Sequence, residues 1–342
     1  MRGLTLSLKN SAWKGSENNM IRSMFAAVSG LRAHQNRMDV ISNNIANVNT
    51  YGFKAGRATF KESIYQNMYN SSAGNNVLGG QNPSQIGYGA QIGAVSVDHA
   101  PGNYEPTGRG TDCMINGNGY FMVGQKSYPT TGGAGGTTTT TSSLVNDGQD
   151  IPKLSLTRVG AFTIDGDGYL VDENRNVVYG FYDKNGAPVQ GTNTFTAEGG
   201  VLKPIRICNP KGTFDDADYA TDGPMPLSQI AIDANGMLSG TGADGTIYKI
   251  AQIAVCNVPN PNALEKVGDS YYQIRNNTGI VKAYIAGEGT TGSLLTNGLE
   301  MSSTNLATEI SNMIITQRGF QANSKMITVS DEMLQDLISM KR

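Results

Sequence analysis

The sequence is poor in the residues on which catalytic and metal sites depend. Its 342 residues include two histidines, three cysteines and one tryptophan, and charged residues make up 16%, below the roughly 25% usual in soluble domains. Cys113, Cys208 and Cys256 are far apart and show no CxxC spacing, which favours buried thiols over a disulfide framework or a metal site. Neither a Gly-x-Ser-x-Gly elbow nor a complete dinucleotide fingerprint occurs. We therefore predict no catalytic residue, no cofactor and no metal.

Charge and hydropathy exclude two further classes of protein. Lys and Arg number 26 against 28 Asp and Glu, giving a net charge of -2, so the positive surface of a nucleic-acid binder is missing. No apolar run approaches the roughly 18 residues of a membrane-spanning helix, and we expect no membrane insertion. Residues 1–19 are polar and lack the apolar centre of a secretory signal. We expect them to be a non-native or disordered extension that precedes Met20.

Both ends of the chain carry a heptad pattern typical of coiled-coil helices. The pattern runs from Ser23 to about Asn47 and again from Leu306 to Ile338, where Thr304 or Asn305 is a plausible N-cap. Polar residues interrupt each stripe, so two ordinary amphipathic helices within one globule stay an alternative. We expect the helices to pair antiparallel into a rod, with leftover apolar surface that further copies would cover. The apolar positions expected to pack in an assembly are Met24, Val28, Leu31, Met38, Ile41, Ile45, Leu306, Ile310, Met313, Phe320, Ile327, Leu334 and Ile338.

The middle of the chain, roughly 85–298, alternates apolar and polar residues between glycines, which indicates antiparallel strands. Asp165-Gly-Asp-Gly and Asp233-Ala-Asn-Gly resemble the start of a calcium loop. Position twelve, however, is Asn176 or Asp244 instead of Glu, so hairpin turns explain both segments better. Thr130–Ser143 is almost wholly Gly and Thr, and we expect a mobile loop.

These patterns predict an α+β fold: terminal coiled-coil helices that pair into a rod, and an antiparallel β-rich central domain with a small inserted β-lobe. The predicted parts are an extension at 1–19, the N-terminal helix with its following signature at 20–54, a connecting segment at 55–90, the first part of the β-domain at 91–180, the inserted lobe at 181–227, the second part at 228–298 and the C-terminal helix at 299–342.

Two longer motifs are far more specific than these patterns. Ser42–Lys54, which reads SNNIANVNTYGFK, resembles the N-terminal signature of the bacterial flagellar rod and hook family, and Met313–Lys325 resembles its C-terminal signature. Gly117–Phe121 and Thr157–Phe162 are similar to the β-domain of that family. The resemblance covers nearly all of residues 20–342. Its signature residues here are Asn43, Asn44, Ala46, Asn47, Thr50, Gly52, Phe53, Lys54, Gln317, Arg318 and Asn323.

The resemblance implies a subunit whose terminal helices line the inner wall of a tube while β-domains build the outside. Gly79–Gly89 and Leu202–Ile207 resemble hook proteins, which favours a hook subunit, a torque-transmitting link between rod and filament, over the distal rod protein. The family implies self-polymerisation and contacts with the distal rod protein, the hook cap and the hook–filament junction proteins. It also implies passage through the flagellar export apparatus to a location at the basal body and hook, outside the cell. A secreted adhesin on a helical stalk is less favoured, because it predicts a signal peptide and a polar or metal site.

Overall fold

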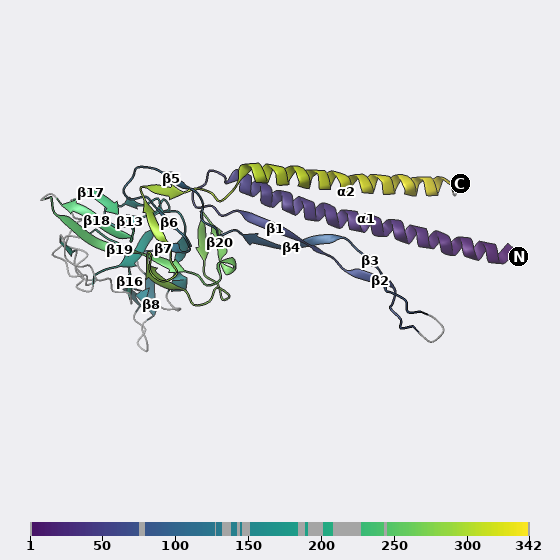
Figure 1. Ribbon diagram of the computed structural model, residues 1–342, viewed down its shortest axis with the longest axis horizontal. Helices are drawn as coiled ribbons and strands as arrows, with labels where there is room; N and C mark the ends of the chain where they lie inside the picture. The colour runs from purple at the N-terminus through teal and green to yellow at the C-terminus, as the bar shows by residue number, and fades with distance from the viewer. Residues whose placement is uncertain are drawn as a thin grey trace. The chain divides into compact units, whose positions relative to one another are not determined.

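A computed structural model describes residues 2–74, 79–126, 128–131, 138–141, 144–145, 151–183, 189–190, 201–207, 227–242 and 245–340. The chain divides into two compact units, drawn in Figure 1. The helical unit comprises Met1–Asn47, Ala55–Asp98 and Thr304–Arg342, and the β-body comprises Val48–Lys54 and His99–Ser303. The sequence patterns place residues 48–54 and 299–303 with the terminal helices. The structure places them in the β-body, because their backbone hydrogen bonds are made there: Gly52 N donates to Glu300 O, and Ser303 N to Phe53 O.

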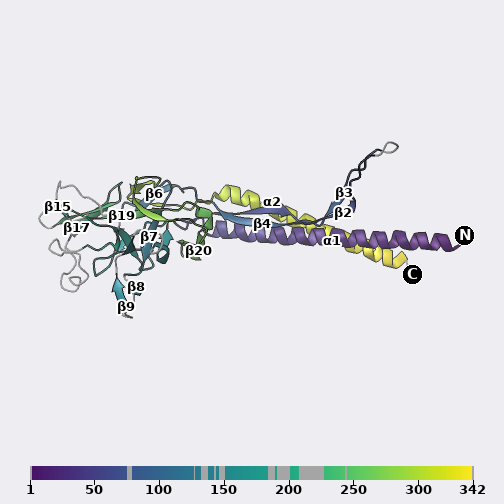
Figure 2. The same ribbon diagram turned by 90° about the horizontal axis from the view of Figure 1, so that it is seen from below.

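Two long helices form the helical unit, α1 (Arg2–Ala46) and α2 (Leu306–Met340). They lie side by side and antiparallel (Figures 1 and 2), and Arg37 Nη2 of α1 donates to Asn312 Oδ1 of α2 at 3.4 Å. The predicted cap of α2 is confirmed, since Asn305 Oδ1 accepts a hydrogen bond from Thr308 N at 3.2 Å.

At the N-terminus of the chain, the prediction of a disordered extension at residues 1–19 differs from the structure, in which helix α1 begins at Arg2. No proline or glycine pair interrupts residues 2–22, so nothing local stops the helix there.

Two β-ribbons complete the described part of the helical unit. They begin in the predicted connecting segment at 55–90 and extend beyond it to Val97, so residues 91–98 belong to the helical unit and not, as predicted, to the β-domain. β1 (Gly56–Glu62) pairs antiparallel with β4 (Ala90–Val97), and β2 (Tyr65–Tyr69) pairs with β3 (Ser84–Gly87). The side chain of Asn44 ties α1 to β1: its Oδ1 accepts from Gly56 N and its Nδ2 donates to Gly56 O, both at 2.8 Å. This pairing satisfies the buried amide of a signature residue.

The β-body is built on an antiparallel sheet of 14 strands among the described residues. Along its main path lie β10 (Leu144–Val145), β16 (Val201–Pro204), β14 (Val177–Phe181), β19 (Ile247–Asn257), β7 (Tyr120–Gly124), β11 (Ser155–Thr157), β21 (Tyr271–Gln273) and β20 (Glu265–Gly268). Beside it lie β12 (Thr163–Ile164), β13 (Leu170–Val171), β15 (Val189–Gln190), β17 (Leu227–Ile232), β18 (Met237–Gly242) and β22 (Lys282–Ile285). Separate pairs are β5 (Tyr104–Pro106) with β24 (Gly298–Glu300), β6 (Cys113–Asn116) with β23 (Ser293–Thr296), and β8 (Tyr128–Thr131) with β9 (Thr138–Thr141). In the described part of the chain, short 3₁₀ helices span Ile151–Lys153 and Pro261–Ala263.

The centre of the sheet is buried on both faces. In β7, Phe121 and Val123 belong to one apolar cluster, whereas Tyr120 and Met122 belong to another. β19 divides in the same way between Val255 and its two neighbours. Because successive side chains of a strand point to opposite faces, the buried centre of each strand needs apolar residues at consecutive positions. That requirement explains the apolar runs Tyr120–Val123 in β7 and Ile253–Cys256 in β19.

Both predicted hairpin turns are confirmed. β12 and β13 flank the turn at Asp165, whose carbonyl accepts from Gly168 N at 2.9 Å, and β17 and β18 flank the turn at Asp233, whose carbonyl accepts from Gly236 N at 2.8 Å. Gly168 and Gly236 have φ values of 82° and 75°, a conformation that favours glycine.

Two other stretches differ from expectation where the structure describes them. In the Gly/Thr-rich stretch expected to be a mobile loop, β8 and β9 pair as a ribbon, because threonine is a good strand former even where composition is polar. In the predicted inserted lobe, β15 pairs with β19 and β16 with β14, so these strands extend the main sheet. Most of residues 181–227 lies outside the described residues.

Candidate functional site

Small and polar side chains fill the contact between α1 and α2. A Cβ added at Gly30 would lie 2.8 Å from Asn323 Nδ2, and one added at Gly319 would lie 2.6 Å from His34 Cε1. Thr316 and Ser330 of α2 are buried and donate to carbonyls of their own helix. Small residues therefore allow the two helices of one chain to approach closely, while many large apolar residues of α2 stay exposed.

This contact only partly coincides with the predicted apolar positions. In α2 the buried or half-buried positions also include Thr316, Asn323, and Asn312 and Gly319, which directly precede the predicted Met313 and Phe320. The same relation occurs in α1, where Ala27, Gly30 and Asn44 directly precede predicted positions. Of the predicted assembly residues, Ile41 is buried; Met24, Leu31, Met38, Ile45, Met313, Ile327 and Leu334 are half-buried; and Val28, Leu306, Ile310, Phe320 and Ile338 are exposed.

The sequence interpretation missed a second apolar band on α2. Ile315 is 60% exposed, and Met326, Met333 and Met340 are also exposed. These residues recur at spacings of eleven, seven and seven, so a search for a second heptad series would have found them. Ile314 of α2 and Phe25 of α1 add further exposed area. The band is larger than the isolated apolar residues common on monomeric surfaces, and such patches mark interaction sites.

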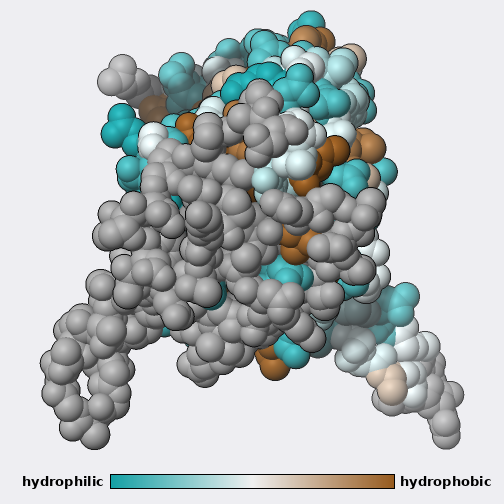
Figure 3. Space-filling view, turned by 90° about the vertical axis from the view of Figure 1, so that its left-hand side faces the viewer, coloured by the Kyte–Doolittle hydropathy of each residue, from teal (hydrophilic) through white to brown (hydrophobic). Residues whose placement is uncertain are grey.

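The face of the β-body in Figure 3 differs from α2 in the distribution of its apolar residues. In the view of Figure 3, hydrophobic residues lie in small separate groups between hydrophilic ones on the part of that face that the structure describes.

The signature residues serve local and long-range contacts. Asn47 Nδ2 donates to Asn43 O and Oδ1 at the end of α1, next to the exposed Ala46, while Thr50 is exposed and Phe53 half-buried in the β-body. On α2, Gln317 and Arg318 are exposed and Asn323 covers Gly30. Gly52 has a φ of 65°, and an added Cβ would lie 2.9 Å from Val159 Cγ2, so this position requires glycine.

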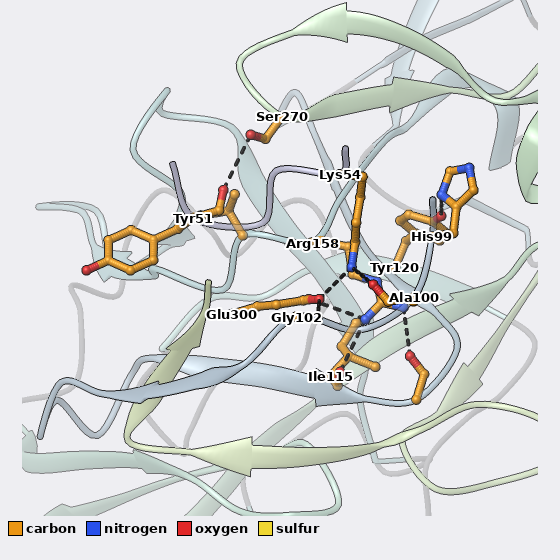
Figure 4. A network of polar contacts seen from close by, with 12 residues as sticks. Tyr51, Lys54, His99, Ala100, Gly102, Ile115, Tyr120, Arg158, Ser270 and Glu300 are labelled. Carbon is orange, nitrogen blue, oxygen red and sulfur yellow. Dashed lines mark hydrogen bonds and ion pairs between the residues drawn. The ribbon is translucent and has the colours of Figure 1, made fainter. Parts of the chain in front are cut away.

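Lys54 belongs to a buried cluster of charged side chains in the β-body, shown in Figure 4. Its Nζ donates to Glu300 Oε1 and to Ala100 O, both at 2.6 Å, and Arg158 Nη1 lies 3.3 Å from Glu300 Oε2. Arg158 also donates to Ile115 O and to the carbonyl of residue 117, at 3.2 and 2.7 Å. The Lys54 and Glu300 side chains are fully buried and that of Arg158 is 2% exposed.

Aromatic rings surround this cluster. Arg158 Cζ lies 5.3 Å from the centroid of the Tyr120 ring, and Tyr120 Oη is 2.7 Å from His99 Nδ1. Burial raises the pKa of Tyr120 far above its ordinary value, and Arg158 offsets part of that rise. The tyrosine therefore stays neutral and acts as a packing and hydrogen-bonding group. The sequence interpretation did not identify Arg158 or Glu300 as functional. Its only signal for this cluster was the single cation in each of two motifs, Lys54 in Ser42–Lys54 and Arg158 in Thr157–Phe162.

A cavity of about 320 Å³ lies in the β-body between Tyr51, Asp172, Glu173 and Tyr271. The Asp172 carboxylate is already satisfied by the backbone N–H groups of residues 174 and 176 and by Tyr271 Oη. Asp172 is therefore a turn-forming residue of the fold.

The described residues contain no group of three or more His, Cys, Asp or Glu side chains that could hold a metal ion. Cys113 and Cys256 are buried free thiols, and burial raises the pKa of Cys256 to about 12, which makes a thiolate nucleophile unavailable. Within the described part of the chain, no helix is both long and apolar enough to cross a membrane.

Comparison with known proteins agrees with this arrangement of terminal helices and β-body. Residues 24–54 match the family described as "Flagella basal body rod protein", and residues 296–340 match "Flagellar basal body rod FlgEFG protein C-terminal". The chain is 33% identical to the flagellar basal-body rod protein FlgG of Bacillus subtilis, across 94% of the chain and 100% of that protein. It is 27% identical to the flagellar hook proteins FlgE of Borreliella burgdorferi and of Treponema pallidum, again across 94% of the chain and 100% of each relative.

Proposed function

Because the chain belongs to the flagellar rod and hook family, we propose that it is a subunit of the bacterial flagellar hook. In this role it self-assembles into a helical tube that joins the rod to the filament and transmits motor torque while bending. As a member of this family the chain is a structural protein of the flagellum and not an enzyme.

One observation carries the proposal of self-assembly: α2 packs on α1 with small and polar residues at the closest approach and leaves many of its large apolar side chains exposed. Ile315 and Ile338 are 60% and 67% exposed. Burial of each such side chain stabilises an assembly by about 1–2 kcal/mol. Further copies of the same chain supply a matching apolar surface, and repetition of one contact generates a helical polymer.

In the proposed tube, α1 and α2 form the inner wall as coiled-coil layers, and the β-body lies outside. The packing residues are the apolar positions predicted from the sequence, together with the missed band at Ile315, Met326, Met333 and Met340. The strongly exposed members contact neighbouring subunits. The half-buried members, such as Ile327, contribute to both kinds of contact.

Sequence features support the hook assignment. Gly79–Gly89 and Leu202–Ile207 are hook-like segments, and 181–227 lengthens the chain relative to the usual distal rod protein. The distal rod is the second candidate, favoured by the 33% identity to a rod protein against 27% to hook proteins. The hook alignments also extend over 441 and 463 positions for a chain of 342 residues, so any outer part of this subunit is reduced.

The proposed partners follow from a place between rod and filament. They are other copies of the chain, the distal rod protein, the hook cap and the hook–filament junction proteins. We further propose delivery through the flagellar export apparatus, for which a chain with few charges and many glycines is suited.

Electron microscopy of the polymerised chain tests both the function and the choice between candidates. A hook subunit forms tubes that curve and supercoil, whereas a rod subunit forms tubes that are always straight. Absence of any tube across a range of protein concentrations, from a chain that is folded by circular dichroism, would contradict self-assembly itself.

A further inference from the structure

A single buried carboxylate connects three segments of the β-body that lie far apart in sequence. Glu300 Oε1 accepts hydrogen bonds from Lys54 Nζ at 2.6 Å and from Gly102 N at 2.7 Å, and Oε2 lies 3.3 Å from Arg158 Nη1 (Figure 4). The backbone adds a further contact, since Glu300 O accepts from Gly52 N at 2.8 Å.

The position of these segments in the chain gives the contact its importance. Lys54 follows α1, which ends at Ala46, by a few residues, and Glu300 precedes α2, which begins at Leu306, by a few residues. Ala100, which accepts from Lys54, follows directly on the segment that ends at Asp98. The cluster therefore holds the places at which the chain enters and leaves the β-body.

The buried charges of this cluster depend on one another for stability. Lys54 and Glu300 have no exposed side-chain surface, and Arg158 has almost none. Two cations share one carboxylate, so loss of that charge deprives both buried cations of the carboxylate that they share. Such a loss is much more destabilising than replacement of a charged pair by apolar groups.

The residues of the cluster are far apart in sequence. Lys54 and Glu300 are 246 residues apart, and Arg158 and Glu300 are 142 apart. Closing loops of this length carries an entropy cost that other contacts of the β-body must offset.

We propose that Glu300 is a positioning residue for assembly: through Lys54 and Arg158 it closes the β-body onto the two segments that lead to the helices, and only a closed subunit polymerises. The second part rests on the proposed function, whereas the first is a property of the monomer. Glu300 thereby makes the fold of the β-body a condition for holding the two segments of the body that lead to α1 and α2.

A double-mutant cycle tests the closure in the monomer. Glu300→Gln keeps the shape and hydrogen-bond acceptor but removes the charge, and should lower the thermal midpoint of the β-body by about 10 °C. Lys54→Met in the Glu300→Gln background removes one stranded cation and should restore part of that loss. Glu265→Gln is the matched control, because Glu265 pairs with Arg275 on the surface, and should shift the midpoint by no more than about a degree.

The proposal would be overturned if the loss of thermal midpoint in the double variant equalled the sum of the losses from Glu300→Gln and Lys54→Met alone. Additive losses would mean that residue 300 only packs, because the Glu300→Gln chain would then gain nothing from removal of Lys54. Polymerisation is then measured below the thermal transition of each variant. Glu300→Gln should need at least a tenfold higher protein concentration, and the double variant should recover part of it. A folded Glu300→Gln chain that polymerises like the wild type would refute the link to assembly. If the wild type itself does not polymerise, the proposed function fails, while the monomer cycle still decides the closure.

Discussion

Replacement of Ile315 by glutamine should weaken polymerisation without weakening the folded monomer. The Ile315 side chain is 60% exposed on α2. Complete burial of an isoleucine contributes about 1.5–3 kcal/mol, so covering the remaining surface contributes about 1–2 kcal/mol per subunit. Since about 1.4 kcal/mol corresponds to a factor of ten, the critical concentration should rise roughly five- to thirty-fold. The monomer should change by no more than about 0.5 kcal/mol, because the substitution is at its surface.

The assay is sedimentation of polymer at a series of total concentrations, with the plateau of protein in the supernatant taken as the critical concentration. Glu332→Gln is the matched control: it also places glutamine on α2 at an exposed position, and should leave the plateau within a factor of two of the wild type. The thermal midpoint of each monomer is measured in parallel. A shift below twofold for Ile315→Gln, or a clear fall in its monomer midpoint, would refute assignment of this band to contacts between subunits.

Three other substitutions test separate parts of the structure. Gly160→Ala should cost the β-body about 3 kcal/mol, because the new Cβ would lie 1.8 Å from Cys113 O; a thermal midpoint equal to wild type would show that the backbones can separate. Ile327→Asp should abolish sedimentable polymer, because its carboxylate is desolvated in every subunit, while the β-body keeps its resistance to limited proteolysis; normal polymer would contradict this. Burial, and then Arg37, lower the pKa of His34 below its ordinary value of 6.5. Unfolded His34 therefore binds a proton first, so circular dichroism melts should show the helical unit losing stability as the pH falls below about 6.5, a loss that His34→Gln removes.

Local chemistry made several elements predictable from sequence. Asn305 has the side chain that an N-cap needs, and the turns at Asp165 and Asp233 each end in a glycine at positive φ. Heptad spacing likewise predicted both terminal helices. In each case the residues that determine the structure are close together in sequence. The sequence pattern therefore includes every residue that makes the local contact.

The partner of each helix face could not be predicted in the same way. A heptad stripe shows that a face will be covered, but does not show whether the same chain or another copy covers it. Here the helices of one chain approach closely at Gly30 and Gly319. Small residues therefore face the partner helix of the same chain, and Ile315 stays exposed. The role of the predicted assembly residues stays a prediction until polymer is examined.

The charge cluster was beyond sequence reasoning for a different reason. Lys54 lies in a recognisable motif, but its counter-ion Glu300 is 246 residues away. A lone Glu before a helix is ordinarily a solvated residue, and only the fold brings the two together. The same limit applies to Arg158, whose partners come from two segments distant in sequence: the carbonyls of residues 115 and 117, and the carboxylate of Glu300.

The central claim is that the exposed apolar band of α2 becomes buried between subunits, and thiol labelling of Met326→Cys tests it most directly. Met326 is 52% exposed, so the new thiol should react readily in the monomer. The unsubstituted chain, in which Cys113 and Cys256 are buried, supplies the background. In sedimented polymer the rate of labelling should fall at least tenfold. Equal rates in monomer and polymer would contradict the account, because the band would then lie in water in both states.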